Sequence, residues 1–246
     1  MKDMAAIILA GGEGTRFNQG KPSLKPKVLY KVNGIPMIVY CLDLLKKIGV
    51  GEVVIVVGYR GDEIRKSLGE KYKYAVQENP LGTGDAVSKG LEKISSLNKN
   101  VIVLYGADIY SEKTITRVIS KQIKDNLTII FVTMKLEEPS GFGRIVRDKA
   151  GNIKAIVEEK VATEEEKKIK EVNDGCYVFN KDWLERNINT LKLSKAKEYV
   201  LTDLVAVALN ESSKVETYTI DKSSDWIGID SLDDIKKAEK KLKERR

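Results

Sequence analysis

The sequence predicts an α/β protein in which a mixed, mostly parallel central sheet carries helices on both faces. Short apolar runs, typical of strands buried on both faces, cover residues 4–10, 53–57 and 101–105. Helices are expected between them, beginning near residues 36 and 61. Strands that alternate with helices imply parallel pairing and right-handed crossovers. In such sheets ligands bind at the carboxyl ends of the strands, so the loops that follow the strands are the first places to search.

The other segments continue this alternation along the chain. A turn at Asn33-Gly34 precedes the helix that begins at Pro36, and Gly49 is placed to end that helix. Residues 72–77 form an expected edge strand, and a helix is expected from residue 83. The rest of the chain should add strands at 127–134, 153–158, 175–179 and 215–220, and helices at 163–170, 181–191 and 231–246.

The composition allows one large domain and favours an anionic substrate. Of the 246 residues, 42% are hydrophobic, which is enough for an ordinary core, and the net charge is +7 with a pI near 9.1. Much of the basic excess lies at residues 236–246, where we expect the solvated face of a terminal helix. No basic stretch is interleaved with aromatic residues, so nucleic acid is not an expected partner.

Histidine is absent from the sequence, which excludes Ser-His-Asp triads, Cys-His pairs and H-E-x-x-H zinc sites. The two cysteines, Cys41 and Cys176, do not form a C-x-x-C motif and are expected to be small buried residues in a reducing compartment. The N-terminal apolar run is too short for a signal peptide, and no segment approaches the length of a membrane span. These features favour a soluble, cytoplasmic protein without a membrane partner.

The stretch from residue 7 to residue 29 carries the strongest chemical signal. A strand leads into L-A-G-G-E-G-T-R, and P-K-V-L follows with Lys27. Glycine lets backbone N–H groups approach a ligand closely, and fixed cations complement them, so the stretch is suited to holding a polyphosphate. It is not a P-loop, and it is not a dinucleotide fingerprint because Phe17 takes the place of the third glycine. The glycines are Gly11, Gly12 and Gly14.

This pattern resembles the sugar-nucleotide pyrophosphorylases, the nucleotidyltransferases that make nucleotide-diphosphate sugars. The resemblance covers residues 4 to about 235, with the motifs in the family's order. It implies a Rossmann-like, GT-A-like nucleotidyltransferase fold in a single domain over residues 1–246. Within that domain we expect a nucleotide-binding half at 1–110, a sugar-binding half at 111–230 and a C-terminal helix at 231–246, with no acetyltransferase repeat domain.

Within the first loop, the resemblance implies catalytic roles for Arg16 and Lys27. Arg16 and the glycine amides would hold the leaving pyrophosphate, and Lys27 would neutralise the α-phosphate or the incoming phosphate. The resemblance also implies that one run of residues binds the nucleotide, namely Leu9, Ala10, Gly11, Gly12, Gly14 and Thr15.

The loop Q-E-N-P-L-G-T-G-D-A-V is the second candidate site. Gln77 offers both a donor and an acceptor, which suits an imide such as uracil or thymine, and the N–H groups at the next helix start are free. From the residues alone, a simple Pro-Gly turn with a threonine cap fits equally well. Q-x-x-x-L-G-T-G resembles the uridylyltransferases of N-acetylglucosamine 1-phosphate, which implies that Gln77, Gly82 and Thr83 face the uracil.

Two aspartates are the candidate ligands of Mg²⁺. Asp108 follows the strand at 101–105, where a carboxylate can hold Mg²⁺ between phosphates. The resembled enzymes have Y-G-D here, whereas Ala107 lengthens this chain by one residue. Asp230 lies where those enzymes have asparagine or aspartate, either of which can bind the metal. The alternative for both aspartates is a helix cap or turn cap.

The resemblance also implies a sugar-binding set in the second half of the chain. E-P-S-G-F-G-R-I-V contains Gly143, whose backbone would meet an acetamido sugar. Glu158 and Asn173 resemble the ligands of the sugar hydroxyls, and from the residues alone both are ordinary loop positions. Thr202 and Asp203, in E-Y-V-L-T-D-L, are expected to cap a helix.

The expected reaction is nucleotidyl transfer from UTP to N-acetylglucosamine 1-phosphate, with Mg²⁺ as cofactor. The sugar phosphate oxygen would attack the α-phosphorus in line and expel pyrophosphate, and it needs no general base because it is already anionic. One alternative is a hexose-1-phosphate uridylyl- or thymidylyltransferase. Another is a catalytically silent nucleotide-sugar sensor, which the shifted register of Asp108 favours. A nicotinamide-dependent dehydrogenase is disfavoured by Phe17.

Overall fold

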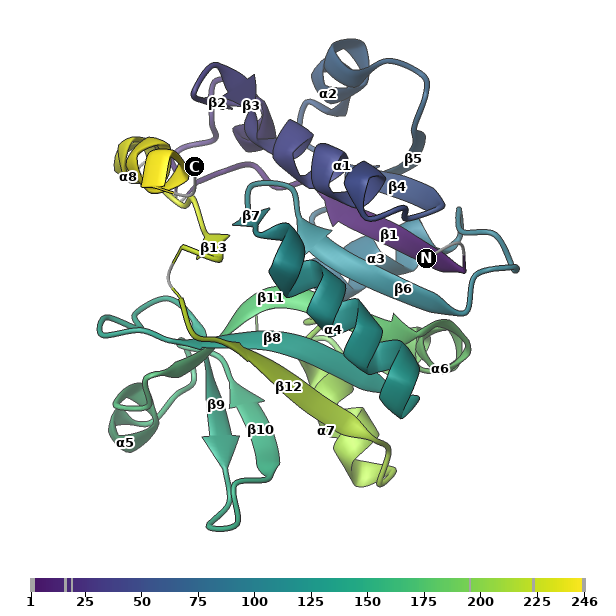
Figure 1. Ribbon diagram of the computed structural model, residues 1–246, viewed down its shortest axis with the longest axis vertical. Helices are drawn as coiled ribbons and strands as arrows, with labels where there is room; N and C mark the ends of the chain where they lie inside the picture. The colour runs from purple at the N-terminus through teal and green to yellow at the C-terminus, as the bar shows by residue number, and fades with distance from the viewer. Residues whose placement is uncertain (1–2, 16, 19, 195, 223, 245–246) are drawn as a thin grey trace.

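The structure is a computed structural model that describes residues 3–15, 17–18, 20–194, 196–222 and 224–244. Its centre is a nine-stranded mixed sheet (Figure 1). In the first half, β5, β4, β1 and β6 lie side by side and are all parallel. Their bounds are β1 Met4–Leu9, β4 Glu52–Val57, β5 Lys73–Val76 and β6 Asn100–Tyr105. The central strands therefore lie within a residue or two of the apolar runs that predicted them.

The second half of the sheet is joined to the first by β11 (Glu171–Asn180), which runs antiparallel to β6, β8 and β9. The pairing of β11 is irregular between Asn173 and Tyr177, where Gly175 has a φ of +97°. A Cβ on Gly175 would lie 2.2 Å from the ring of Tyr105, so the bare backbone lets this ring pack against the strand. The remaining strands of this half are β8 Ile129–Lys135, β9 Gly143–Arg147, β10 Ile153–Val157 and β12 Val215–Ile220.

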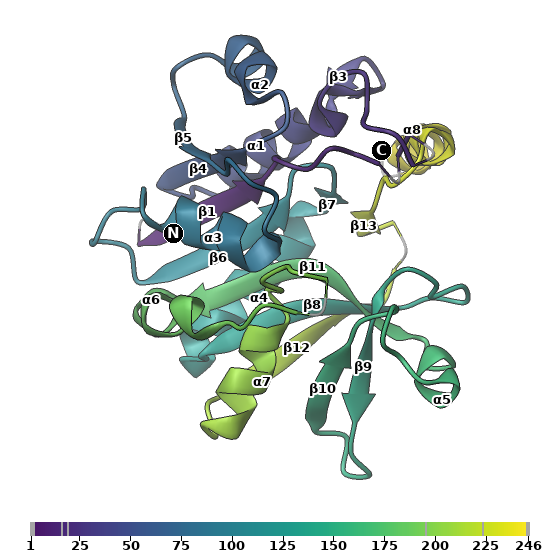
Figure 2. The same cartoon turned by 180° about the vertical axis from the view of Figure 1, so that it is seen from behind.

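Helices cover both faces of the sheet, as the sequence predicted. One face carries α1 (Met37–Lys47) and α4 (Glu112–Asp125), and the other carries α3 (Thr83–Leu91) and α7 (Asp203–Asn210), as Figures 1 and 2 show. The remaining helices are α2 Gly61–Leu68, α5 Glu164–Lys167, α6 Lys181–Asn187 and α8 Leu232–Glu244, with 3-10 turns η1 Lys27–Leu29 and η2 Ile188–Thr190.

Strand β1 shows why the core has two layers. Its residues Met4, Ala6 and Ile8 belong to the cluster under α1 and α4, whereas the alternating residues of β1 belong to the cluster under α3, α6 and α7. All six residues of β1 are buried, as expected for a central strand between two helical layers. The end of this strand is consequently fixed from both sides, and the glycine loop starts there.

Two short ribbons complete the fold. The β2 (Lys31–Val32) and β3 (Ile35–Pro36) hairpin turns through Asn33 and Gly34, both with positive φ, as the Asn-Gly pair predicted. The second ribbon pairs β7 (Ile109–Tyr110) antiparallel with β13 (Trp226–Ile227). It brings a C-terminal segment back beside the carboxyl end of β6. Among the described residues, none of the helices combines the length and apolar character that a membrane span requires.

Candidate active site

Three loops meet at the carboxyl ends of β1, β4 and β5 through direct contact of their backbones. A Cβ on Gly11 would lie 3.0 Å from the amide nitrogen of Gly58. A Cβ on Gly58 would lie 2.8 Å from the carbonyl oxygen of Gly11 and 3.1 Å from that of Gln77. The Tyr59 amide also donates to the Gly11 carbonyl at 3.0 Å. Glycine at 11 and 58 therefore lets the first loop and the Gln77 loop form one continuous surface.

The residues at the start of the glycine loop differ in what they can offer a ligand. Leu9 and Ala10 are buried, and their backbones remain within the sheet: Gly106 donates to the Leu9 carbonyl, and the Ala10 amide donates to Val56. Gly12 is exposed, and a Cβ there would meet nothing within 4 Å. Of the predicted positions, Gly12 is the open one, whereas Gly11 packs against Gly58, Gly14 packs against Ser23 and Lys27, and Thr15 is half-buried. Arg16, the predicted catalytic cation, lies outside the described residues.

A buried serine fixes the loop that leads from the glycines to Lys27. Ser23 has no exposed surface, and its amide donates to the Glu13 carbonyl at 2.9 Å. The Tyr59 hydroxyl donates to the Ser23 carbonyl at 3.0 Å, and the Ser23 hydroxyl donates to the hydroxyl of Tyr30 at 3.2 Å. The chain then enters η1, where Lys27 begins the turn. These bonds fix the loop between the glycines and Lys27.

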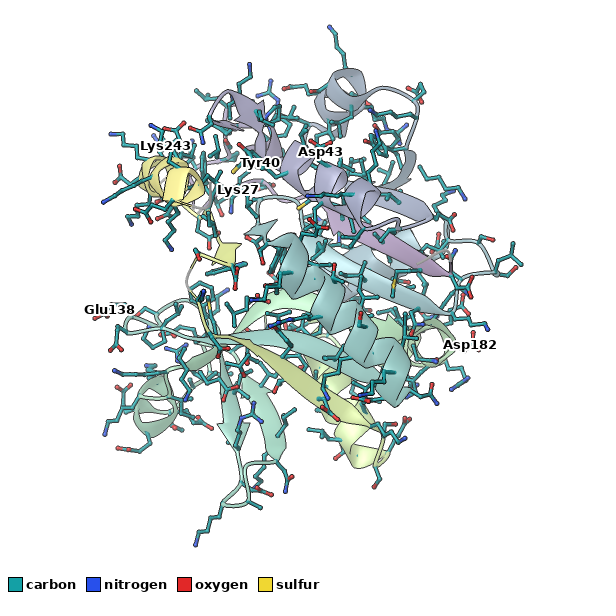
Figure 3. All side chains as sticks on the ribbon, in the orientation of Figure 1. Lys27, Tyr40, Asp43, Glu138, Asp182 and Lys243 are labelled. Atoms are coloured by element: carbon teal, nitrogen blue, oxygen red, sulfur yellow. The ribbon has the colours of Figure 1, made fainter. Side chains whose placement is uncertain are left out.

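The ammonium group of Lys27 meets a carboxylate from the other end of the chain. Its Nζ lies 2.7 Å from Oδ1 of Asp230, although 203 positions separate the two residues. The Lys27 side chain is 20% exposed and the Asp230 side chain 47%, so the pair lies at an accessible surface rather than in the core. Figure 3 shows Lys27 on the side of the molecule that faces α8.

Asp108 and Asp230 approach the same region through the β7–β13 ribbon. Ile109 is opposite Ile227 in this antiparallel pair, so Asp108 directly precedes β7 and Asp230 lies three residues beyond Ile227. Neither aspartate is a helix cap: Ser111 caps α4 by accepting from Thr114, and the Ser231 hydroxyl accepts from the Asp234 amide at the start of α8. Asp230 is instead paired with Lys27, and Asp108 is buried.

The donor set suits a magnesium ion that is shared with phosphates. Mg²⁺ prefers oxygen ligands and is commonly bound by one or two carboxylates together with substrate phosphates. Within the described part of the chain, no group of three or more acidic or thiol side chains is arranged to hold an ion alone. An ion bound by Asp108 and Asp230 would therefore require further oxygen ligands, which a triphosphate supplies.

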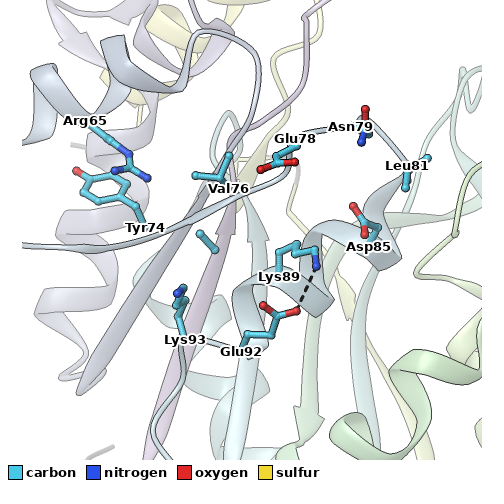
Figure 4. Close-up of a pocket in the computed structure, with 11 residues that line it drawn as sticks. Arg65, Tyr74, Val76, Glu78, Asn79, Leu81, Asp85, Lys89, Glu92 and Lys93 are labelled. Carbon is cyan, nitrogen blue, oxygen red and sulfur yellow. Dashed lines mark hydrogen bonds and ion pairs between the residues drawn. The ribbon is translucent and has the colours of Figure 1, made fainter.

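The Gln77 amide is hydrogen-bonded within its own loop. Its Nε2 donates to the carbonyl of Gly82 at 2.9 Å and to Oδ2 of Asp85 at 2.7 Å. Its donor capacity, which the sequence suggested for base recognition, is thus used by the protein, and Oε1 accepts no bond from any described residue. Beside this loop, β5, α2 and α3 border a groove of about 620 Å³ that Asp85 also lines (Figure 4).

The turn at Gly82 is tied to the segment before α7. The Tyr199 amide donates to Leu81 at 2.7 Å, the Gly84 amide donates to Tyr199 at 2.8 Å, and the Leu201 amide donates to Oγ1 of Thr83 at 3.0 Å. A Cβ on Gly82 would lie 2.5 Å from the Tyr199 carbonyl oxygen, and its φ is +97°. Position 82 therefore requires glycine on two grounds. In the bond from the Leu201 amide, the Thr83 hydroxyl oxygen is the acceptor.

The three predicted sugar-side residues lie together at one end of the second half. Gly143 and Asn173 are register partners in β9 and β11, and a Cβ on Gly143 would lie 3.5 Å from Oε1 of Glu158. The Thr202 hydroxyl donates to the same Oε1 at 2.9 Å. Thr202 is the N-cap residue of α7 and Asp203 lies in its first turn, as predicted, but the Thr202 side chain makes no cap bond because its hydroxyl donates to Glu158. Gly143, Glu158 and Asn173 thus share one surface with Thr202.

A sequence model of the nucleotidyl transferase family matches residues 5–245. The chain belongs to this family. The match spans nearly the whole chain, so both halves of the sheet belong to the nucleotidyl transferase.

Relatives that are identical to this chain at about a third of the aligned positions support this membership. The bifunctional protein GlmU of Thermoanaerobacter pseudethanolicus is 37% identical over 247 residues, which is 100% of this chain and 53% of that protein. GlmU of Acetivibrio thermocellus is 37% identical over 93% of this chain and 49% of its own length. The chain thus spans about half the length of these curated relatives. They match this chain over nearly its whole length, in agreement with the family model.

The fold has a close counterpart among solved structures. A crystal structure reported as that of a glucose-1-phosphate thymidylyltransferase from Bacillus anthracis matches with a TM-score of 0.80. The match covers 96% of this nucleotidyl transferase and 94% of the other chain at 21% identity. It confirms the predicted fold: a mixed, mostly parallel sheet with helices on both faces.

Four residues of the site escaped sequence reasoning. Ser23 and Tyr59 are ordinary loop residues in the sequence, and Asp85 matches a generic acid in the first turn of a helix. Thr202 stands just before a helix, where a threonine is expected to act as an ordinary N-cap. Only their tertiary contacts show that these residues belong to the site. The position of Asp85 directly after L-G-T-G was nevertheless a usable signal in the sequence.

Proposed function

We propose that this nucleotidyltransferase converts UTP and N-acetylglucosamine 1-phosphate into UDP-N-acetylglucosamine and pyrophosphate. The observation that carries the proposal is the 2.7 Å contact between Lys27 and Asp230. It joins the candidate catalytic cation to a candidate metal ligand at the edge of the glycine loop. Lysine for the phosphates and an acid for Mg²⁺ are side chains that nucleotide-binding phosphoryl transfer enzymes use, and here the two lie side by side.

Each group has a part in the proposed reaction. A sugar phosphate oxygen attacks the α-phosphorus in line, and it needs no base because it already carries negative charge. Lys27 neutralises charge on the phosphates, while the amides that follow Ala10 hold the departing pyrophosphate. Arg16, which lies outside the described residues, is proposed to share this role because the sequence resemblance implies it. Mg²⁺ held by Asp108 and Asp230 would supply charge neutralisation at the α-phosphate.

Recognition of the two substrates is assigned to the two ends of the site. Gln77, Gly82 and Thr83 are proposed to meet the base, next to the glycine loop, which the backbone of Gln77 approaches at Gly58. Gly143, Glu158 and Asn173 are proposed to meet the sugar, with Glu158 oriented by the Thr202 hydroxyl. The similarity to bifunctional GlmU proteins supports N-acetylglucosamine 1-phosphate and UTP as the substrates.

A second candidate is a hexose-1-phosphate thymidylyl- or uridylyltransferase. Two observations favour it: the fold match to a protein reported as a glucose-1-phosphate thymidylyltransferase, and a carboxylate rather than an amide at Asp230. An acceptor at Gln77 suits thymine as well as uracil, since both carry an N–H at position 3.

The decisive experiment is a panel of sugar 1-phosphates offered with UTP or dTTP in the presence of Mg²⁺, scored by pyrophosphate release. We expect the highest kcat/KM for N-acetylglucosamine 1-phosphate with UTP. A higher value for glucose 1-phosphate with dTTP would select the second candidate. If no pair turned over while UDP-N-acetylglucosamine still bound in calorimetry, the chain would be a sensor rather than an enzyme.

A further inference from the structure

The orientation of the Gln77 amide can be assigned from its partners. Both groups that face its nitrogen, the Gly82 carbonyl at 2.9 Å and the Asp85 carboxylate at 2.7 Å, are acceptors. The opposite orientation of the amide would put Oε1 against two other oxygens. The bond to the carboxylate is charge-assisted and therefore the stronger of the two. Only one of the two amide orientations is compatible with this loop.

This orientation decides what the amide can offer a ligand. An amide nitrogen carries two hydrogens, and both are used within the loop, so Nε2 has none left for a base. The remaining polar atom is Oε1, which can only accept. Uracil and thymine present N3–H and satisfy such an acceptor. Cytosine presents a lone pair at N3, so an oxygen facing it would be repelled and left without a partner.

We propose that Asp85 is a positioning residue that holds the Gln77 amide as an acceptor and thereby selects a base that presents an N–H group. This inference rests on the proposed function, since it concerns how that site chooses its nucleotide. Asp85 does not touch the base; it acts through Gln77. The carboxylate is specifically suited to this task because it accepts and never donates, unlike the amide of an asparagine.

The helix that carries Asp85 is built to keep it in place. Asp85 lies in the first turn of α3, and the Gly84 amide just before it is bonded to Tyr199. A Cβ on Gly84 would lie 2.5 Å from Leu191, and one on Gly90 would lie 2.8 Å from Ile7, so α3 packs closely on both elements. Figure 4 shows the Asp85 side chain extending from α3 toward the loop that carries Asn79 and Leu81.

The test compares UTP with CTP in the wild-type protein and in Asp85→Asn, a change that preserves shape but introduces a donor. With an amide at position 85, the charge-assisted bond is lost and only the Gly82 carbonyl still opposes the turned Gln77 amide, which would present its nitrogen to the base. We expect the ratio of kcat/KM for UTP over CTP to fall by about tenfold or more. The loss for UTP should fall on KM rather than on kcat, because the reacting phosphates are untouched.

Glu92→Gln is the matched control, since Glu92 also lies on the exposed side just after α3 and pairs with Lys89 rather than with Gln77. It removes one carboxylate charge in the same way and should leave the UTP to CTP ratio at the wild-type value. Melting temperatures of both variants complete the set. A lower melting temperature for Asp85→Asn with an unchanged ratio would assign Asp85 to helix stability and overturn the inference.

The outcomes separate this inference from the proposed function. If the wild-type protein turns over no nucleoside triphosphate with any sugar 1-phosphate, the proposed function is wrong, and binding of UDP against CDP by calorimetry then provides the ratio. If the wild-type protein is active and Asp85→Asn discriminates as well as the wild-type protein, only the role of Asp85 is wrong. Equal kcat/KM values for UTP and CTP in the wild-type protein would also contradict the proposed role of Asp85.

Discussion

The two halves of the sheet position their functional groups by different means. In the parallel half, the loops after β1, β4 and β5 touch through bare backbone at Gly11, Gly58 and Gln77. In the second half, where β11 pairs antiparallel with β8 and β9, the proposed sugar ligands are oriented by side-chain bonds such as that of Thr202 with Glu158. Phosphates are bound well by N–H groups of the main chain, whereas sugar hydroxyls need a specific arrangement of side-chain donors and acceptors.

This difference has a consequence for mutations. A backbone-built site is damaged by adding atoms, whereas a site built from side chains is damaged by removing them. Lys27 belongs to neither class, because it is a side chain that serves the backbone-built half. Variants of each kind therefore test whether the comparison holds.

The largest effect is expected for Lys27→Ala. Loss of a cation that stabilises charge in the transition state should lower kcat by about 100- to 1,000-fold. The melting temperature should change little, because the Lys27 pair with Asp230 is partly exposed and such pairs contribute about 0–1 kcal/mol. Lys47→Ala, which removes a surface pair with Glu112, is the control. A large loss of stability with unchanged kcat would make Lys27 structural.

The second effect concerns the metal. Asp230→Ala should raise the Mg²⁺ concentration needed for half-maximal rate by about tenfold or more, because one of two candidate carboxylate ligands is lost. A titration of the initial rate against Mg²⁺ measures this, and chelation of the metal should abolish turnover of the wild-type protein. An unaltered Mg²⁺ curve in the variant would count against the metal role of Asp230.

The third prediction adds one carbon to the backbone-built half. Gly82→Ala should destabilise the protein and raise KM for UTP, because the new methyl group meets Tyr199 and the φ is unfavourable. Gly69→Ala is a close control: Gly69 has a φ of +78°, and nothing lies within 4 Å of its Cβ position. Backbone strain alone should lower the free energy of unfolding of Gly69→Ala, measured in urea, by about 1–3 kcal/mol without changing KM for UTP. Equal losses in both variants would show that the contact with Tyr199 is unimportant.

The fourth prediction removes a donor from the side-chain-built half. Thr202→Val keeps the shape of the side chain but leaves Glu158 without its hydroxyl partner. We expect KM for the sugar 1-phosphate to rise by about fivefold, since one ordinary hydrogen bond contributes about 1 kcal/mol. KM for UTP should stay constant, and Thr202→Ser should restore the wild-type value. An equal rise in both KM values would mean that the two halves of the site are not separable.

The smallest expected effect concerns the thiols, which lie in the core shared by both halves. Burial raises the pKa of the Cys41 thiol, as does the nearby Asp108, and burial likewise raises the pKa of Cys176. Both thiols therefore stay protonated and covered at neutral pH. In the native protein neither should react with a disulfide reagent over minutes, and both should react after denaturation. Rapid labelling of the native protein would show that this part of the core opens.

The sequence predicted the parallel half better than the second half for physical reasons. A buried strand such as β1 is a continuous apolar run, and the glycine loop after it has few alternative explanations, so the place of Gly11 and Lys27 could be inferred. In the second half, Glu158 and Asn173 look like ordinary loop positions, and only the resemblance singled them out. Thr202 was expected as a cap because local rules do not report which distant carboxylate a hydroxyl will meet.

The Asp85 contact shows the same limit at shorter range. The segment from Gln77 to Asp85 is only nine residues long, and both residues were visible in the sequence. Whether the amide nitrogen or oxygen faces the base depends on how the intervening turn folds back, which the positive φ of Gly82 permits. The residue types were therefore predictable, whereas the direction of the hydrogen bond was not.

The bonds that join the turn at Gly82 to the segment before α7 have a thermodynamic consequence. Three main-chain amides, those of Tyr199, Gly84 and Leu201, secure this turn before any nucleotide arrives. The entropy of ordering the turn is therefore lost when the protein folds and not when the base binds. The groups that contact the base are preorganised. We therefore expect that ordering of this turn contributes little to the free energy of nucleotide binding, whichever sugar 1-phosphate is bound at the other end of the site.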